Sequence, residues 1–301
     1  MIMRMKLHPP WLKKRLAVTG DFYTTREALR AAGVNTVCES AHCPNMTECF
    51  SRSFATFLIL GKRCTRRCGY CAVENGELNP PDPEEPDRIA MAASALGLDY
   101  AVITSVTRDD LPDGGSYQFV RTIEALRAAR PGIRIELLIP DFGGDADSLV
   151  RIVSSEAHII GHNIETVRRL YPALRRGSDY DRSLGVLRRV REMDPRQATK
   201  SGIMVGLGET FSEVLETMGD LKSAGCDMLT IGQYLCPDGL LNVPVREFVS
   251  PQIFKTYEAA GAEMGFKDVY SGSFVRSSYM ADISYSKLKE EYDECHVAAA
   301  C

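Results

Sequence analysis

The sequence contains no long hydrophobic run and no marked excess of charge of either sign. Its longest strongly apolar stretch is residues 54–60, interrupted by Thr56, and a membrane span needs about 18 apolar residues. Residues 1–16 carry charges and prolines rather than an apolar run, so we expect no secretory signal and a cytoplasmic protein. The formal net charge of −4 gives no general attraction to nucleic acid or to an anionic membrane.

Cysteine is abundant: the chain of 301 residues holds ten. Disulfide frameworks are typical of small secreted chains, whereas clustered cysteines in a reducing compartment more often bind metal or do redox chemistry. Six of the ten lie between Cys38 and Cys71 and are therefore the candidates for chemistry. We assign no function to the scattered remainder, which are Cys226, Cys236, Cys295 and Cys301.

From residue 54 onward, short apolar runs alternate with segments whose apolar residues have helical spacing. We predict strands at 54–60, 100–105, 133–139, 157–160, 202–207 and 228–232, with a weaker seventh at 266–270. We predict helices at 86–96, 116–130, 145–154, 179–193, 213–223 and 251–264. Thr210 and Glu213 have the spacing of a capping box. The alternation indicates a parallel sheet closed or nearly closed into a barrel, with a doubly wound open sheet as the alternative.

The two ends of the chain depart from this alternation. A short helix is predicted at 24–32, and the rest of the chain before residue 54 looks irregular. Residues 271–279 also look irregular, and a charged helix is predicted at 285–292. We therefore divide the chain into an N-terminal extension at 1–53, a barrel at 54–270 and a C-terminal segment at 271–301.

Cys64, Cys68 and Cys71 form a CxxxCxxC motif directly after the first predicted strand. Thiolates are soft ligands that suit iron–sulfur clusters or zinc. Three thiolates can hold three irons of a [4Fe–4S] cluster and leave the fourth iron open, and an open metal position is typical of a catalytic site. The carboxyl ends of barrel strands also carry active sites in this architecture. A zinc knuckle or a ferredoxin-like cluster is the alternative, but each normally has a fourth ligand, and none follows Cys71 at short range.

With the aromatic Tyr70 before its third cysteine, this motif resembles the signature of the radical S-adenosylmethionine (SAM) superfamily. In that superfamily SAM binds the open iron, and an electron from the cluster cleaves it to methionine and a 5′-deoxyadenosyl radical. The resemblance implies a partial (β/α)6 barrel similar to a TIM barrel, with the N- and C-terminal extensions covering its mouth. Polar contacts to SAM are expected from loops after the strands. The candidates are Tyr70, Thr104, Ser105, Asn163, Glu165, Gly206, Gly208 and, on a helix, Arg191.

Cys38, Cys43 and Cys49 form a second triplet, Cx4Cx5C, before the barrel. Together with the CxxxCxxC motif and Arg-Ser-Ser-Tyr at 276–279, this triplet resembles one family of the superfamily, the lipoyl synthases. The similarity covers most of the chain, including residues 10–13, 101–115, 162–167 and 200–210.

The family resemblance implies an auxiliary [4Fe–4S] cluster held by the second cysteine triplet and by Ser278, with catalytic roles for Ser278 and Arg276. A serine oxygen is a harder ligand than a thiolate, so the iron at that corner should be easier to release. The implied reaction inserts sulfur at C6 and C8 of an octanoyl chain that is amide-linked to a lysine of a carrier protein, and the auxiliary cluster supplies the sulfur.

The resemblance also implies partners for a monomeric enzyme. They are lipoyl domains of 2-oxoacid dehydrogenase complexes, the glycine cleavage carrier protein, an electron donor such as ferredoxin or flavodoxin, and an iron–sulfur carrier protein. Arg66 and Arg67 lie in the first cysteine loop, where basic residues would form a docking rim for an acidic carrier domain.

Two other interpretations stay open at this point. Another two-cluster radical SAM enzyme that inserts sulfur or transfers a methylthio group would share both cysteine motifs. Methylthiotransferases, however, normally add a substrate-binding domain for which this chain has no spare length. A non-enzymatic electron carrier or metal-storage protein would share the cysteines but would need neither an open iron nor a barrel. Formation of 5′-deoxyadenosine from SAM separates that carrier from every enzyme interpretation.

Overall fold

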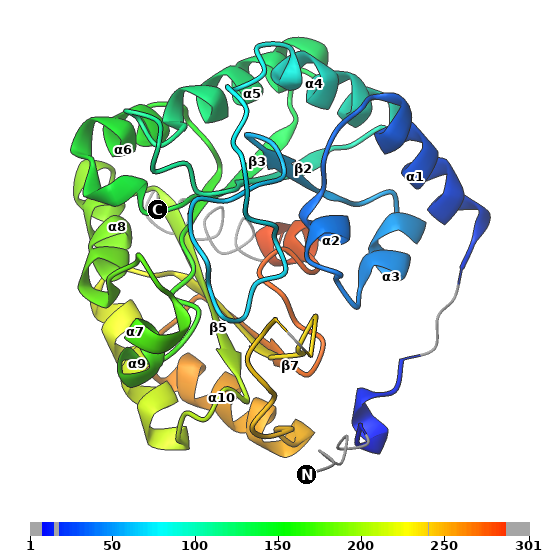
Figure 1. Ribbon diagram of the computed structural model, residues 1–301. Coiled ribbons are helices and arrows are strands. Elements are labelled where there is room, and N and C mark those ends of the chain that lie inside the picture. Colours follow the sequence, from blue (N-terminus) through cyan, green and yellow to red (C-terminus); the bar gives the residue numbers. More distant parts are fainter. Residues whose placement is uncertain (1–7, 15–17, 240, 287–301) are drawn as a thin grey trace, which may run out of the picture.

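The computed structural model describes residues 8–14, 18–239 and 241–286. Within them, seven parallel strands form one sheet in sequential order: β1 (Thr56–Ile59), β2 (Tyr100–Ser105), β3 (Arg134–Leu138), β4 (Ile159–Gly161), β5 (Ala198–Val205), β6 (Met228–Gln233) and β7 (Asp268–Gly272). Strand order reverses in a doubly wound sheet, so the sequential order excludes that alternative. The sheet curves into a barrel that stays open between β1 and β7 (Figure 1).

In the described chain, a helix follows each strand from β1 to β6 and lies outside the sheet (Figure 1). These helices are α4 (Glu85–Ala95), α5 (Ser116–Ala129), α6 (Ala146–Val153), α8 (Tyr180–Met193), α9 (Phe211–Ser223) and α10 (Pro251–Glu263). The partial (β/α)6 barrel is therefore confirmed, and the weak seventh strand is confirmed as β7. The capping box is confirmed too, since the Thr210 hydroxyl accepts from the Glu213 N–H and the Glu213 carboxylate accepts from the Thr210 N–H.

The core lies between the sheet and its outer helices. One apolar cluster joins the first half of the sheet to α4 and α5 through side chains such as Phe57, Ile103 and Phe119. A second joins β5 and β6 to α9 and α10 through Ile231 and Phe254 among others. Each fully buried side chain of this size contributes about 1.5–3 kcal/mol, so the two clusters hold the strand ends in fixed positions. No helix among the described residues has the length and apolar content that crossing a bilayer requires.

The N-terminal extension contains more helix than we expected. α1 (Gly20–Ala31) confirms the predicted short helix and begins four residues before residue 24. The stretch that carries the second cysteine triplet, Cys38, Cys43 and Cys49, folds as α2 (Val37–Ser40) and α3 (Met46–Ser51). The expectation of irregular chain there is therefore wrong. The Thr36 side chain caps α2 by accepting from the Glu39 N–H at 3.2 Å, and such caps stabilise even a single helical turn.

We expected the extensions to cover the barrel mouth. The C-terminal extension reaches the mouth, where Ser277 accepts from Asn163, and both extensions also line the open side between β1 and β7. Leu58 of β1 donates its N–H to the Asn35 carbonyl at 2.9 Å, which satisfies the free edge of β1. On the other edge, the ring of Tyr279 stacks on Tyr270 of β7 with 6.1 Å between centroids. The Asn45 side chain joins the two extensions by donating to the Phe274 carbonyl at 2.6 Å.

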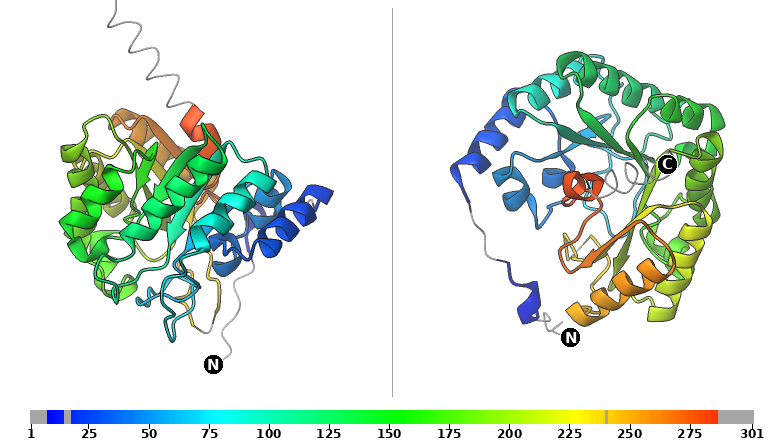
Figure 2. Two further views of the ribbon diagram at one scale, coloured as in Figure 1. Left: turned by 90° about the horizontal axis from the view of Figure 1, so that it is seen from above. Right: turned by 180° about the vertical axis from the view of Figure 1, so that it is seen from behind.

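The chain after residue 280 reaches the amino ends of the strands. Residues 281–286 are helical, and the ring of Tyr285 contacts Tyr100 at the start of β2 and His158 just before β4. Figure 2 (left) shows this stretch in red at the end of the barrel opposite the loop that follows β1. Most of the helix predicted at 285–292 lies outside the described residues, as do Cys295 and Cys301.

Candidate active site

The loop after β1 presents Cys64, Cys68 and Cys71 at the carboxyl end of the barrel. The Cys64 sulfur accepts N–H bonds from Arg66 at 3.4 Å and from Thr107, in the loop after β2, at 3.3 Å. The Cys71 sulfur accepts from the Val73 N–H at 3.5 Å. Hydrogen bonds to sulfur tune the potential of an iron–sulfur cluster, so these N–H groups are part of the site.

Neighbouring loops clamp the backbone of this cysteine loop. Gly69 donates its N–H to the Leu174 carbonyl of α7 (Tyr171–Leu174) at 2.7 Å. The Asn242 amide, from the chain after β6, donates to the carbonyls of Gly69 at 3.3 Å and Cys71 at 2.8 Å. The cysteine loop is thus held by the segments that follow β4 and β6.

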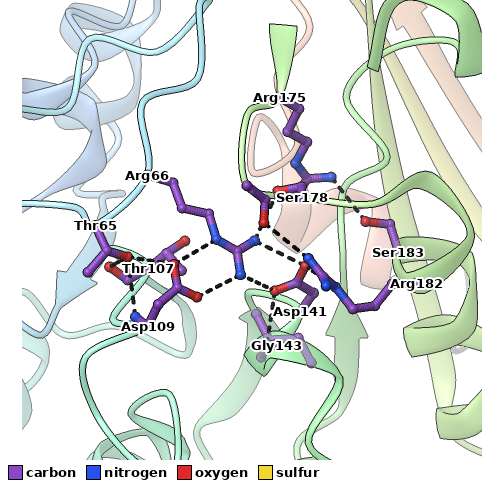
Figure 3. A network of polar contacts seen from close by, with 12 residues as sticks. Thr65, Arg66, Thr107, Asp109, Asp141, Gly143, Arg175, Ser178, Arg182 and Ser183 are labelled. Atoms are coloured by element: carbon purple, nitrogen blue, oxygen red, sulfur yellow. Dashed lines mark hydrogen bonds and ion pairs between the residues drawn. The ribbon is translucent and has the colours of Figure 1, made fainter. Parts of the chain in front are cut away.

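Arg66 anchors the same loop through a network of ion pairs (Figure 3). Its guanidinium contacts Asp109 and Asp141, in each case with a closest approach of 2.7 Å, and donates to the Ser178 hydroxyl at 2.9 Å. Asp141 is fully buried and accepts a further bond from Arg182 at 2.8 Å. Burial alone would raise the pKa of Asp141, but the hydrogen bonds and charge of Arg66 outweigh it and hold that pKa below its usual range.

This network corrects one expectation. The Arg66 side chain is only 8% exposed and is engaged by two carboxylates, so it is not available for a docking rim. Its neighbour Arg67 is exposed.

The second cysteine triplet lies beside β1. Cys38 is buried in α2 and Cys49 in α3, and Cys43 lies between these helices. Burial, helped by the nearby Cys43, raises the pKa of the Cys38 and Cys49 thiols to about 12. A buried thiol of this kind is inert unless a metal or a cation stabilises its thiolate.

The structure brings Ser278 to this triplet although some 230 residues separate them in sequence. Thr56, the first residue of β1, donates its hydroxyl to the Ser278 oxygen at 2.8 Å. The same Thr56 lies near the Cys38 thiol, where it lowers the pKa that burial raises. Ser278 and the cysteines therefore share one small region.

The segment preceding Ser278 runs between the two cysteine sites. The Asn163 amide, just after β4, donates to the Ser277 hydroxyl at 2.6 Å and to the Glu165 carboxylate at 3.0 Å. Arg276 is partly buried, and it interacts electrostatically with both Cys43 and Glu165. Burial raises the pKa of Cys68 and Cys71, and Glu165 adds to that rise, so the electrostatics of the two cysteine sites are linked through Arg276 and Glu165.

The other SAM candidates gather at the carboxyl ends of the strands, with one exception. Thr104 and Ser105 end β2, and Asn163 and Glu165 follow β4. Gly206 and Gly208 follow β5 with φ values of 98° and 112°, and Gly206 has no room for a side chain, because a Cβ there would lie 2.2 Å from Gln233. Arg191 is the exception: it pairs with Asp227, directly before β6 at the amino end of the sheet.

The residues at these strand ends fit a polar ligand. The Ser105 hydroxyl and the Asn163 amide oxygen are buried and have no hydrogen-bond partner among the described residues. Buried polar atoms are normally paired, so both atoms remain available for a bound molecule. Beside them, three thiols and a clamped loop provide the donor set that a [4Fe–4S] cluster with one open iron requires.

Arg175 was not singled out from the sequence, where it appears only as one of several basic pairs. Its partly buried guanidinium donates to the Asn163 carbonyl at 2.6 Å and to the Tyr171 hydroxyl at 2.5 Å. Burial raises the pKa of Cys68, and the charge of Arg175 partly offsets that rise. Only the tertiary fold, which turns α7 toward the cysteine loop, distinguishes it from a solvated arginine.

In the described residues, no three His, Cys, Asp or Glu side chains converge on a point where they would hold a single metal ion. A [4Fe–4S] cluster binds each thiolate to a different iron, so its ligands need not converge on one point.

Comparisons with known proteins agree on the family. Residues 58–221 match the model of the Radical SAM superfamily. The chain is 52% identical over 278 residues to a lipoyl synthase of Caldanaerobacter subterraneus, covering 92% of this chain and 97% of that protein. It is 53% identical over 275 residues to a lipoyl synthase of Geobacter metallireducens, covering 91% and 95% respectively.

Solved structures support the fold. Methylornithine synthase (PylB) has a TM-score of 0.52 at 16% identity, covering 71% of this chain and 70% of that one. SuiB of Streptococcus suis bound to S-adenosylmethionine has a TM-score of 0.58 at 12% identity, covering 75% and 54%. From the motifs, the barrel and these similarities together, the chain belongs to the lipoyl synthase family of the radical SAM superfamily.

Proposed function

We propose that this protein is a lipoyl synthase, which inserts two sulfur atoms at C6 and C8 of an octanoyl chain carried on a lysine of a lipoyl carrier protein. The observation that carries the proposal is the position of the Arg-Ser-Ser-Tyr segment. Ser277 is hydrogen-bonded to Asn163 at the barrel mouth, and Ser278 is hydrogen-bonded to Thr56, which lies near Cys38. One short segment thus connects the two cysteine sites, as an enzyme with two cooperating clusters requires.

We assign the ligands from the family resemblance, and their positions in the fold support the assignment. Cys64, Cys68 and Cys71 would hold the [4Fe–4S] cluster that binds SAM. Cys38, Cys43, Cys49 and Ser278 would hold the auxiliary [4Fe–4S] cluster. When bound, the two clusters and SAM supply the electron, the carbon-centred radical chemistry and the sulfur atoms of the reaction.

The chain's own residues would then bind and orient SAM and the substrate. Asn163, Glu165 and Ser105 offer polar atoms to SAM beside the open corner of the first cluster, with Tyr70, Thr104, Gly206 and Gly208 around them. Arg276 lies between the two sites, where its charge balances Glu165 on one side and the Cys43 thiolate on the other. The substrate chain has to lie between both sites so that one carbon at a time meets the radical.

The finer assignments follow from the same proposal. Residues 1–53 form the extension that brings the auxiliary cysteines, 54–270 the barrel, and 271–301 the segment that brings the serine. The carriers are lipoyl domains of 2-oxoacid dehydrogenase complexes and the glycine cleavage carrier protein. A ferredoxin or flavodoxin supplies electrons, an iron–sulfur carrier protein rebuilds the auxiliary cluster, and the enzyme works as a monomer in the cytoplasm.

Anaerobic reconstitution tests the proposal. The full chain is loaded with iron and sulfide, given SAM, dithionite and an octanoyl-lysine peptide, and the peptide is weighed by mass spectrometry. We expect about eight irons per chain, from two four-iron clusters, and a peptide that gains two sulfurs. Deoxyadenosine formation with an unchanged peptide would refute the substrate and favour another two-cluster radical SAM enzyme. About four irons without SAM cleavage would refute the enzyme itself.

Two triple variants serve as matched controls. Replacing Cys38, Cys43 and Cys49 by alanine should halve the iron content and preserve deoxyadenosine formation. Replacing Cys64, Cys68 and Cys71 should also halve the iron content but abolish deoxyadenosine formation. If either set leaves the iron content unchanged, that set does not hold a cluster.

A further inference from the structure

We propose that Lys14 is a positioning residue that fastens the serine-bearing C-terminal segment to the auxiliary cysteine helix and thereby controls how readily the auxiliary site releases its iron. The inference rests on the proposed function, because it presupposes an auxiliary cluster held by Cys38, Cys43, Cys49 and Ser278. It concerns a residue outside both cysteine motifs, in the short N-terminal stretch 8–14 that lies across the open side of the barrel (Figure 1).

Lys14 is bound to the auxiliary cysteine helix by two polar contacts. Its ammonium group donates to the Asn45 amide oxygen at 2.7 Å and lies 2.5 Å from the Glu48 carboxylate. Asn45 precedes α3, and Glu48 lies within it, directly before Cys49. The side chain of Lys14 is 23% exposed, so solvent screens this pair less than a pair on the open surface.

The same ammonium group lies over two aromatic rings of the C-terminal segment. It is 5.3 Å from the ring centroid of Phe274 and 5.4 Å from that of Tyr279, both within cation–π range. Tyr279 directly follows Ser278 in the chain. One cation is therefore shared between the segment that carries the serine and the helix that carries a cysteine.

Two further hydrogen bonds join the partners of Lys14 to each other. The Tyr279 hydroxyl donates to the Glu48 carboxylate at 2.8 Å, and the Asn45 amide donates to the Phe274 carbonyl at 2.6 Å. The cation, the carboxylate, the amide and the two rings thus form one closed set of contacts around the lysine. Removing the cation takes away the ion pair to Glu48 and both cation–π contacts, so the two segments should separate more easily.

The rest of the N-terminal stretch holds Lys14 in place. Leu12 is buried, and the ring of His8 contacts Phe248 on the chain between β6 and α10 at 5.3 Å. The stretch is therefore fixed on both sides of the open edge. A strap of this kind can resist the separation of the serine and cysteine segments without itself ligating iron.

Iron release to a chelator tests the proposal without any turnover. The full chain is reconstituted anaerobically, and release is followed at 25 °C for the wild type and for Lys14→Gln, Lys14→Arg and Lys13→Gln. Lys13 is the matched control, since it is exposed and adjacent on the same stretch. We expect Lys14→Gln to accelerate release of one half of the iron by about tenfold, from the loss of an ion pair and two cation–π contacts. Lys14→Arg should restore most of the wild-type rate, and Lys13→Gln should match the wild type.

The same variants in a chain whose Cys64, Cys68 and Cys71 are alanine show which half of the iron responds. Acceleration that persists in that background supports the proposal. An unchanged rate for Lys14→Gln, or equal acceleration of both halves of the iron, overturns it.

If Lys14→Gln loads no auxiliary iron, Tyr279→Phe decides the matter, because it removes only the bond to Glu48 and keeps the ring. Faster release from the same half of the iron supports the proposal, and a wild-type rate refutes it. A wild-type protein that binds only one cluster would instead refute the proposed function, so the two failures are distinguishable.

Discussion

Replacing Arg66 by alanine should destabilise the protein by more than its position in a surface loop suggests. The substitution removes both ion pairs and the bond to Ser178, and it leaves Asp141 fully buried. Breaking a buried ion pair from one side costs about 3–5 kcal/mol. Asp141 keeps Arg182 at 2.8 Å and the Gly143 N–H at 3.1 Å. We therefore expect a loss of about 2–3 kcal/mol in the free energy of unfolding.

The other carboxylate in the network, Asp109, gives a smaller expected loss with which the loss for Arg66→Ala can be compared. Asp109 is 42% exposed, and ion pairs of exposed groups contribute about 0–1 kcal/mol. Asp109→Asn should therefore cost less than about 1 kcal/mol. Arg67→Ala is the matched control, because its side chain is exposed on the same loop, and surface substitutions usually stay within about 0.5 kcal/mol. The loss of unfolding free energy for Arg66→Lys should lie between those of Arg67→Ala and Arg66→Ala, because an ammonium group cannot engage both carboxylates in bidentate fashion.

Urea denaturation of the cluster-free protein, followed by far-UV circular dichroism, measures these differences. The reasoning is refuted if Arg66→Ala and Arg67→Ala have the same stability, or if Asp109→Asn costs as much as Arg66→Ala. A second readout is the radical SAM cluster itself. Arg66→Ala should weaken iron retention at Cys64, Cys68 and Cys71 and leave the auxiliary iron unchanged.

Three further predictions follow from the site. Ser278→Cys should retain the auxiliary cluster, because a fourth thiolate is a good ligand, but should slow formation of the lipoyl product; an unchanged single-turnover yield would count against the serine argument. Gly206→Ala should lose activity and cost at least about 1 kcal/mol of unfolding free energy, because alanine is strained at a φ of 98° and its Cβ would clash with Gln233. The control is Gly219→Ala, since a Cβ at Gly219 on α9 would meet open space. Burial lowers the pKa of His162 to about 3. Between pH ~6.5 and ~3 the unfolded chain therefore binds a proton at this residue that the folded chain does not. The free energy of unfolding should fall as the pH falls through this range. Unfolding of His162→Gln across that range should show a shallower pH slope than the wild type, and an equal slope would contradict the assignment.

Local patterns in the sequence predicted the barrel, because buried strands and amphipathic helices each have a distinct spacing of apolar residues. α2 and α3 escaped this reasoning, since four and six residues are too few to show a period; the only local signal was Thr36 as a cap. The contact between Ser278 and the Cys38 region was expected only from family resemblance, because no local pattern relates residues so far apart.

The misplaced and missed arginines have a common physical reason. The spacing of apolar residues in α8 does not show which end of the sheet Arg191 reaches. In the fold it pairs with Asp227 at the amino end. Arg66 was expected in a docking rim and Arg175 was not singled out, because only the fold shows that they engage Asp141 and Asn163. The path of the two extensions depends likewise on the unpaired edges of β1 and β7, which no local pattern in the sequence reveals.

The origin of the inserted sulfur tests the account most directly. The protein is reconstituted with heavy-isotope sulfide, freed of excess sulfide, and allowed one turnover on the octanoyl-lysine peptide with SAM and dithionite. The account predicts a product that carries two heavy sulfur atoms per peptide, and no such product from the variant lacking the thiols of Cys38, Cys43 and Cys49. A product with unlabelled sulfur, or equal labelling from that variant, would contradict an auxiliary cluster held by these residues as the sulfur source.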